Sequence, residues 1–362
     1  MRSGVARLVL AGVLLTLLVS PALAIADLPA ALDYLKSQQN ADGGFGNGFS
    51  PESGLGSTAD VLLAIVALGG DVASFAQASN TPLTYLAANA PSAVSAGDLS
   101  KLILVLVPAG ENPRTFGGVD SVSKLEALAR ADGRIGGAAD TFVSTLVAVV
   151  ALKSVQRPIP AASLDLIRQA QQESGGWAWD GTAATAADTN TTAYALQALV
   201  AGGEPVDGPA ATKALAYCDA IQNEDGGWPY QNPSDFGTAT DANSTAVTVQ
   251  AILAAGQDPA GARWTSAGGM TPYDALDGLQ NASGAWAWKA DVPGDNLLAT
   301  VQAAPARAGK ALLLSTMGVG DVVSAAPVTV PVTGGLGLDP AWLVAAGAAL
   351  AVGGALLRGR KR

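Results

Sequence analysis

Two kinds of apolar segment alternate along the chain. The first kind is amphipathic. In the segment Ala210–Gln222, apolar side chains recur three or four positions apart, at Ala211, Leu215, Cys218 and Ile221. This spacing places them on one face of a helix. The second kind is apolar on nearly all sides, as in the run from Leu62 to Leu68, which is typical of a helix buried on most of its surface. The pattern therefore predicts helix pairs in which one helix is more buried than its partner.

Six such pairs follow one another along the chain. The amphipathic helices are expected at Leu28–Gln39, Pro82–Asn89, Val122–Ala131, Ala162–Gln172, Pro209–Gln222 and Pro272–Gln280. Each buried helix opens near an aspartate, which we interpret as its N-cap. These aspartates lie 38 to 54 residues apart, at Asp60, Asp98, Asp140, Asp188, Asp241 and Asp295. Such regular spacing indicates an internal repeat.

A loop of constant design joins the two helices of a pair. Four copies run from a glutamine through a small-residue pair to an aromatic residue, at Gln39–Phe45, Gln172–Trp177, Gln222–Trp228 and Gln280–Trp286, and a degenerate fifth has Ile135 in the aromatic position. Helical repeats either stack openly or close into a ring. Open stacks carry atypical polar caps at their ends, but the first and last units here look like the others. The expected fold is therefore an all-α (α/α)6 toroid of six helix pairs, with the buried helices inside and their N-termini at one rim.

From residue 27 to about residue 316, these loops and helices resemble the prenyltransferase and squalene-cyclase repeat superfamily. Its class II terpene cyclases use an Asp-x-Asp-Asp-Thr-Ala motif, in which the middle aspartate protonates an alkene or epoxide. The matching positions here read Asp188-Thr189-Asn190-Thr191-Thr192-Ala193, and Asp241 and Asn243 open the second copy. An amide cannot donate a proton to carbon. The resemblance thus implies the scaffold without its acid, and no catalytic residue is predicted.

Other branches of the superfamily fit less well. Protein prenyltransferases hold zinc with Asp, Cys and His, whereas this chain has no histidine and one cysteine, so no metal site and no cofactor are predicted. Complement-type thioester domains need a Gly-Cys-Gly-Glu-Gln loop, whereas the single cysteine lies in Tyr217-Cys218-Asp219. Cobalamin carriers are non-catalytic extracellular binders, but they add a C-terminal β-domain, and only a linker and an anchor are expected beyond Met317.

Candidate ligand-binding residues cluster in the loops and at the inner helix starts. The first aromatics are expected to pack between repeats, and the second aromatics are candidates to line a pocket for an apolar or sugar-like ligand. The aspartates are interpreted first as N-caps and second as oxygen donors to the rim. The asparagines bond either a ligand or nearby backbone. The full candidate set is Trp177, Trp179, Asp188, Asn190, Trp228, Tyr230, Asp241, Asn243, Trp286 and Trp288.

Both ends of the chain carry targeting signals. Arg2 and Arg7 precede an uncharged run that ends in Pro-Ala-Leu-Ala, which predicts a secretory signal over residues 1–24; a retained N-terminal anchor is the alternative. The toroid is expected over residues 25–318 and a Pro/Gly/Val-rich linker over 319–338. Residues 339–362 contain the uncharged segment Ala341–Leu357 and a basic tail, which predicts a transmembrane anchor with its tail in the cytoplasm.

The segment Val330–Gly334 resembles a cell-wall sorting signal in which valine replaces the usual leucine. Sortase-type cleavage between Thr333 and Gly334 is therefore an alternative to a plain membrane anchor.

The formal net charge is −10, and without the basic ends the remaining chain is more acidic still, which disfavours nucleic acid as a partner. We therefore expect an exported, membrane- or wall-anchored module at the cell surface. It is non-catalytic and binds a small apolar ligand (an isoprenoid, corrinoid or glycan) or a protein partner. The alternatives are a cobalamin carrier-like binder and an enzyme of terpenoid or polysaccharide metabolism. The enzyme needs facing carboxylates, which the loop acids Asp180, Glu224, Asp235 and Asp291 would supply.

Overall fold

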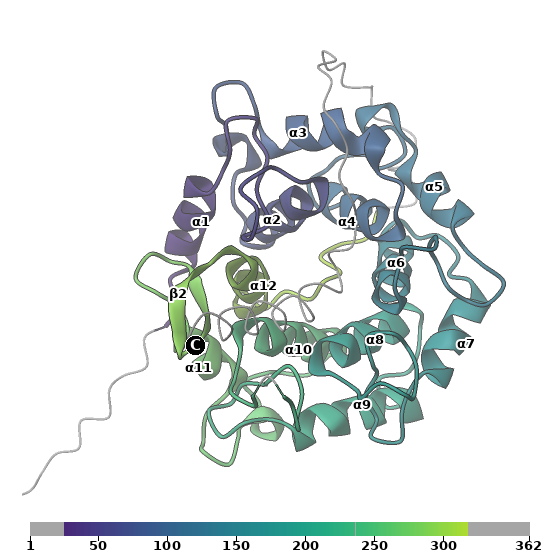
Figure 1. Cartoon of the computed structure of the whole chain (residues 1–362), viewed down its shortest axis with the longest axis vertical. Helices are drawn as coiled ribbons and strands as arrows, with labels where there is room; N and C mark the ends of the chain where they lie inside the picture. The colour runs from purple at the N-terminus through teal and green to yellow at the C-terminus, as the bar shows by residue number, and fades with distance from the viewer. Residues whose placement is uncertain (1–24, 236, 318–362) are drawn as a thin grey trace, which may run out of the picture.

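The computed structural model describes residues 25–235 and 237–317, which form a ring of helix pairs (Figure 1). The inner helices are α2 (Leu55–Ala67), α4 (Ala96–Leu106), α6 (Phe142–Ser154), α8 (Thr189–Ala201), α10 (Ala242–Ala254) and α12 (Leu297–Arg307). The outer helices are α1 (Leu28–Ser37), α3 (Pro82–Asn89), α5 (Ser121–Ala127), α7 (Ala161–Gln169), α9 (Pro209–Ala220) and α11 (Pro272–Asp277). All six predicted pairs are present.

The ring is closed. Each inner helix contacts the next one in chain order, and the last, α12, contacts the first, α2. The predicted toroid is therefore confirmed. Proline occupies the first helical turn of α9 and α11, where its missing N–H is not needed and its fixed φ suits a helix start.

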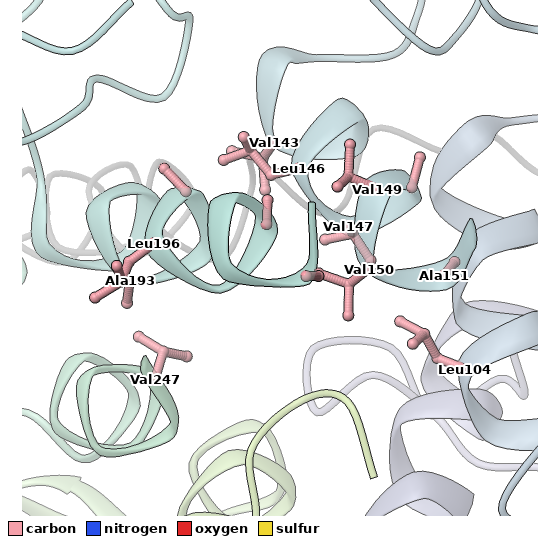
Figure 2. Close-up of a cluster of buried hydrophobic side chains, with 14 of the residues drawn as sticks. Leu104, Val143, Leu146, Val147, Val149, Val150, Ala151, Ala193, Leu196 and Val247 are labelled. Atoms are coloured by element: carbon pink, nitrogen blue, oxygen red, sulfur yellow. The ribbon is translucent and has the colours of Figure 1, made fainter. Parts of the chain in front are cut away.

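Helix α6 shows why the inner helices have apolar residues on nearly all of their faces. All of its residues except Lys153 are buried. Leu146 and Val150 pack toward α8 and α4 in a cluster that also includes Leu104 and Leu196 (Figure 2). A helix that sits between two inner neighbours and an outer layer has almost no surface left for polar side chains.

The loop design builds the same contact in the five pairs that carry the loop. The backbone N–H of Trp228 donates to the hydroxyl of Thr245 on the following inner helix at 3.0 Å, and its indole N–H donates to the Cys218 carbonyl at 2.7 Å. The equivalent backbone N–H groups of the other loops also reach inner-helix threonines, in the pairs Phe45–Thr58, Ile135–Thr145, Trp177–Thr192 and Trp286–Thr300. The degenerate loop thus keeps its fold without an aromatic ring.

In four of the loops, a glutamine links the pair to the following part of the ring. The Gln222 side-chain amide donates to the Gly226 and Trp264 carbonyls, both at 2.9 Å. In the last loop the Gln280 amide donates to the Asp27 carbonyl at 3.0 Å, and its oxygen accepts from the Asp27 N–H. The contact that joins neighbouring repeats therefore also closes the ring. In the loop that ends at Trp177, Gln171 makes the equivalent hydrogen bonds. The predicted start of that loop at Gln172 is therefore one residue late.

The N-cap interpretation holds for two of the six aspartates. The side chains of Asp188 and Asp241 accept from the third backbone N–H of α8 and α10, each at 2.7 Å. The other four aspartates are corrected. Asp60 lies inside α2, and Asp98 lies in the first turn of α4 behind the cap Ser95.

The last two aspartates precede the caps. Asp140 comes before the cap Thr141 and accepts from the first N–H groups of α4. Asp295 precedes the cap Asn296 and accepts from Asn281 and Ser283. These helices begin at other residues, so spacing alone misplaced their starts.

The described chain is not purely α-helical. Strands β1 (Trp286–Lys289) and β2 (Val292–Asn296) form an antiparallel hairpin in the last repeat, with an irregularity in register between Ala287 and Lys289. Short 3₁₀ helices are η1 (Val72–Ser74), η2 (Ala90–Ser92), η3 (Phe116–Gly118) and η4 (Ala262–Trp264). The hairpin replaces an irregular loop and is the main departure from the predicted fold.

The predicted signal (1–24), linker (319–338) and anchor (339–362), with the Thr333–Gly334 processing point, lie outside the described residues. Within residues 25–235 and 237–317, none of the helices has the length and apolar character needed to cross a bilayer.

Candidate functional site

A cavity of about 670 Å³ occupies the centre of the ring. Its wall includes residues from the first two turns of all six inner helices, joined by the loops between pairs. The chain after α12 contributes Ala311, Leu312 and Leu314, and the Leu312 N–H donates to the Gln197 side chain at 3.0 Å. In Figure 1 this yellow-green segment crosses the centre of the ring. The fold therefore encloses a volume large enough for a drug-sized ligand.

Seven of the ten predicted binding residues line this cavity: Trp179, Asp188, Asn190, Tyr230, Asp241, Asn243 and Trp288. The other three, Trp177, Trp228 and Trp286, are fully buried behind the wall, where their indole N–H groups bond outer-helix carbonyls. Those three rings hold loops in place and do not reach the cavity. The i and i+2 aromatics of a loop thus point to different places, as their spacing predicted.

Asp188 is the most deeply buried acid on the wall, at 1% exposed. One carboxylate oxygen caps α8 by accepting from the Thr191 N–H. The other, Oδ2, has no hydrogen-bond partner of good geometry among the described residues, although the Tyr230 hydroxyl is near enough to favour the ionised form. Burial raises the pKa of Asp188 to about 7, against the hydrogen bonds from Thr191 that lower it. Asp188 is therefore about half protonated at pH 7, whereas an ordinary aspartate would be ionised.

The neighbouring copy of the motif is more fully bonded. Asp241 accepts from the Ser244 N–H at 2.7 Å and from the Ser244 hydroxyl at 2.9 Å. Burial raises the pKa of Asp241 to about 6, against these bonds and the nearby positive charge of Lys289. Asn243 donates to the Gln302 side chain of α12 at 2.7 Å. By contrast, the side-chain oxygen of Asn190 is buried without a partner among the described residues.

Across the ring, α2 and α4 carry a second polar group on the wall (Figure 1). Lys101 forms an ion pair with Asp60 at 2.6 Å. Burial raises the pKa of Asp98, which also lies near Asp60 and Asp140, while Ser95 and Lys101 lower it. Sequence reasoning assigned these aspartates to helix caps and missed the group. The only local signal was a lysine three positions after Asp98, which would place both on one helix face.

Between these groups the wall is apolar. Leu104, Val143 and Val147 come from α4 and α6, and Leu297 and Val301 from α12. Trp179 remains 40% exposed in this setting, which leaves its ring accessible.

Several catalytic chemistries find no support here. The chain has no histidine, and the described residues hold no cluster of acidic, cysteine and histidine side chains suited to a metal ion. Burial raises the pKa of Cys218 to about 12, so this thiol stays protonated. The loop acids Asp180, Glu224, Asp235 and Asp291 do not line the cavity, so they do not provide the facing carboxylates that the enzyme reading required.

The buried Asp188 makes stability depend on pH. Because its pKa rises on folding from 3.8 to about 7, its contribution is complete below about pH 4 and is lost as the pH rises through 7. We expect the unfolding free energy to fall between pH 5 and pH 8, with about 2–3 kcal/mol of that fall arising from Asp188. Asp188→Asn keeps a capping oxygen but does not titrate, so it should remove this share.

Urea unfolding of the wild type and of the Asn variant at both pH values measures the difference. Asp241→Asn, at a site whose pKa is about 6, is the matched comparison and should remove a smaller share. Equal pH dependence in the wild type and Asp188→Asn would contradict a buried, protonated Asp188.

A family model described as the prenyltransferase alpha-alpha toroid domain matches residues 5–91 and 142–266. No curated protein sequence matches the chain.

Solved structures share the fold. The type II terpene cyclase MstE from Scytonema without ligand has a TM-score of 0.54 and 15% identity, covering 78% of this chain and 96% of that one. A variant of MstE in complex with its substrate, geranylgeranyl dihydroxybenzoate, has a TM-score of 0.55 and 14% identity, covering 78% and 95%. A protein from Actinoplanes has a TM-score of 0.53 and 14% identity, covering 78% and 97%. At these identities the likeness concerns the fold alone.

Proposed function

This chain belongs to the prenyltransferase alpha-alpha toroid domain family, and from that premise we propose that its central cavity binds an elongated, largely apolar small molecule without cyclising it. One observation carries the proposal. The cavity of about 670 Å³ has an apolar wall between polar groups, and six aromatic residues line it: Phe49, Tyr85, Trp179, Tyr194, Tyr230 and Trp288. This combination suits an isoprenoid chain with a polar end.

The position of the acid argues against alkene protonation. At the place where cyclases of this superfamily carry their proton donor, the chain has Asn190, whose amide is not an acid. Asp188 is the nearest carboxyl in the motif, and its pKa of about 7 makes it a weak proton donor. Protonation of carbon requires a much stronger acid, so the site is better suited to hold a ligand than to cyclise it.

Filling the cavity should block binding. Val147 lines the wall, and Val147→Phe is expected to raise the Kd for geranylgeraniol at least tenfold, about 1.4 kcal/mol. A cyclase of this fold holds a geranylgeranyl compound, which makes this alcohol a suitable probe. Isothermal titration calorimetry measures the affinity, and thermal unfolding checks the fold. Val206→Phe, at an exposed site away from the cavity, is the matched control. Equal loss in both variants, or no binding by the wild type, would reject the proposal.

A terpene cyclase-like enzyme is the second candidate function. It is favoured by one feature: Asp188 is buried, keeps part of its protonated form at pH 7, and lies beside the Tyr230 hydroxyl on the cavity wall. Incubation with squalene or geranylgeraniol followed by extraction and mass spectrometry separates the two functions. Under our proposal the compounds return unchanged. A cyclised product that disappears in Asp188→Asn would establish the enzyme instead.

We further propose that the toroid is exported and held at the cell surface. The support is the predicted signal over residues 1–24 and the apolar segment Ala341–Leu357 with its basic tail. Val330–Gly334 leaves wall attachment through Thr333 as the alternative. Mass spectrometry of the C-terminal peptide from the membrane fraction tests this: an intact C-terminus supports the membrane anchor, and cleavage after Thr333 supports wall attachment.

A further inference from the structure

Lys289 stands on the cavity wall in a position that the repeat pattern does not predict. It ends strand β1, in the hairpin found in the last repeat. The pairing register shifts between Ala287 and Lys289. In a regular strand, consecutive side chains point to opposite faces. Both Trp288 and Lys289 nevertheless line the cavity, because such an irregularity turns a side chain out of alternation.

The Lys289 side chain is buried in the wall, and its ammonium group has no polar partner among the described residues. The residue is 7% exposed. Within the described part of the chain, it has no carboxylate at ion-pair distance and no hydrogen-bond acceptor, and its ammonium lies 4.3 Å from the centre of the Trp288 ring. The oxygens of the nearby Asp241 are occupied by Ser244. An ammonium on a cavity wall with unused donors is available to a ligand that supplies an acceptor.

The other charged residues on the wall limit which ligand group can accept hydrogen bonds from Lys289. The basic residues that line the cavity are Lys101 and Lys289, and Lys101 is already paired with Asp60. The acids on the wall are Glu52, Asp60, Asp98, Asp188 and Asp241. One free ammonium can match one negative charge. It cannot offset the several charges of a diphosphate among these carboxylates.

We propose that Lys289 binds a single carboxylate at the end of the apolar ligand, so that the cavity selects an amphiphilic monocarboxylate over the matching alcohol or diphosphate. This inference rests on the proposed function, because it names the polar end of the molecule that the cavity holds. Ammonium and carboxylate form a charge-assisted hydrogen bond, which is stronger than one between neutral groups.

Calorimetric titration of the full-length protein with three probes of one chain length tests the inference: geranylgeranoic acid, geranylgeraniol and geranylgeranyl diphosphate. At pH 8 the acid is expected to bind at least tenfold more tightly than either of the others. Oleic acid is a fourth probe that tells whether an unbranched lipid acid serves as well as an isoprenoid acid; tight, Lys289-dependent binding of either acid supports the carboxylate site.

Variants separate a binding role from a structural one. Lys289→Met should weaken acid binding tenfold or more and leave alcohol binding within threefold, whereas Lys289→Arg should keep the preference for the acid. Lys213→Met, on the exposed face of α9 away from the cavity, should change neither affinity. The melting temperature of ligand-free Lys289→Met should not fall, because methionine keeps the packing of the buried stem and Lys289 makes no ion pair or hydrogen bond with the described residues.

The outcomes distinguish the two proposals. Binding of the alcohol with no preference for the acid overturns this inference and leaves the proposed function standing. Lys289→Met that weakens acid and alcohol equally, or that lowers the melting temperature, assigns Lys289 a structural role and also overturns it. If none of the probes binds, the proposed function fails, and this inference fails with it.

Discussion

Replacing Trp228 with alanine is expected to lower the free energy of unfolding by about 3–5 kcal/mol, the range for deleting a large buried aromatic side chain. Trp228 is fully buried, its indole N–H donates to the Cys218 carbonyl at 2.7 Å, and its ring meets Trp264 edge to face at 6.0 Å. The substitution removes all three contributions and leaves the Cys218 carbonyl with only the longer bond from the Ile221 N–H at 3.3 Å. Urea unfolding followed by circular dichroism measures the loss.

Trp179→Ala is the matched control, because that ring is 40% exposed on the cavity wall. Its expected effect on stability is within about 0.5–1 kcal/mol, and its effect on ligand binding should be much larger. The unfolding free energy of Trp228→Phe should lie between those of Trp228→Ala and the wild type, because phenylalanine keeps most of the packing and loses the hydrogen bond. A Trp228→Ala variant within 1 kcal/mol of the wild type would show that the first aromatic of the loop does not hold the repeats together.

Replacing Gly284 with alanine should weaken the closure of the ring and lower stability by ~3 kcal/mol or more, of which left-handed backbone alone accounts for ~1–2 kcal/mol. Gly284 has φ +86°, and a Cβ there would lie 2.2 Å from the backbone of Ala30 in α1. The last loop and the first helix would have to move apart to admit a methyl group. The glycines of four other loops approach the next outer helix in the same way: Gly43, Gly133, Gly175 and Gly226.

Gly269→Ala controls for backbone strain alone. Gly269 has φ +77°, but a Cβ there would meet no atom within 4 Å, so its cost should be limited to about 1–2 kcal/mol. Thermal and urea unfolding of both variants compare them directly. If the two variants lose the same stability, the close approach between the last loop and α1 does not contribute to closure.

The helix pairs were predictable because their signals are local. A run such as Leu62–Leu68 shows burial through its own composition, and the loops carry small residues where the backbone turns and approaches a neighbour. The caps were predicted less well. Asp188 and Asp241 cap their helices, but α2 begins at Leu55, ahead of Asp60. Asp60 instead pairs with Lys101, a residue of the neighbouring inner helix, and no local pattern reveals such a pair.

The sequence placed candidate residues on the cavity wall where the Asp-x-Asn motif occurs in two copies. The copies at Asp188–Asn190 and Asp241–Asn243 both reach the cavity, as do the second aromatics of their loops. Trp177, Trp228 and Trp286 were also among the candidates, although the first aromatic of each loop was expected to pack between repeats. Their positions behind the wall follow from their hydrogen bonds to inner and outer helices on either side of the loop.

The sequence by itself determined the repeat, the twelve helices and the exclusion of imidazole chemistry, because each depends on composition and on contacts within a few residues. Only the tertiary structure decided that the ring closes through Gln280 and Asp27, that burial raises the pKa of Asp188, and that Lys289 reaches the cavity. Each of these depends on side chains from distant repeats meeting in one place, or on a shift in strand register. The loss of water around a group and the charges that face it arise only when those repeats pack together.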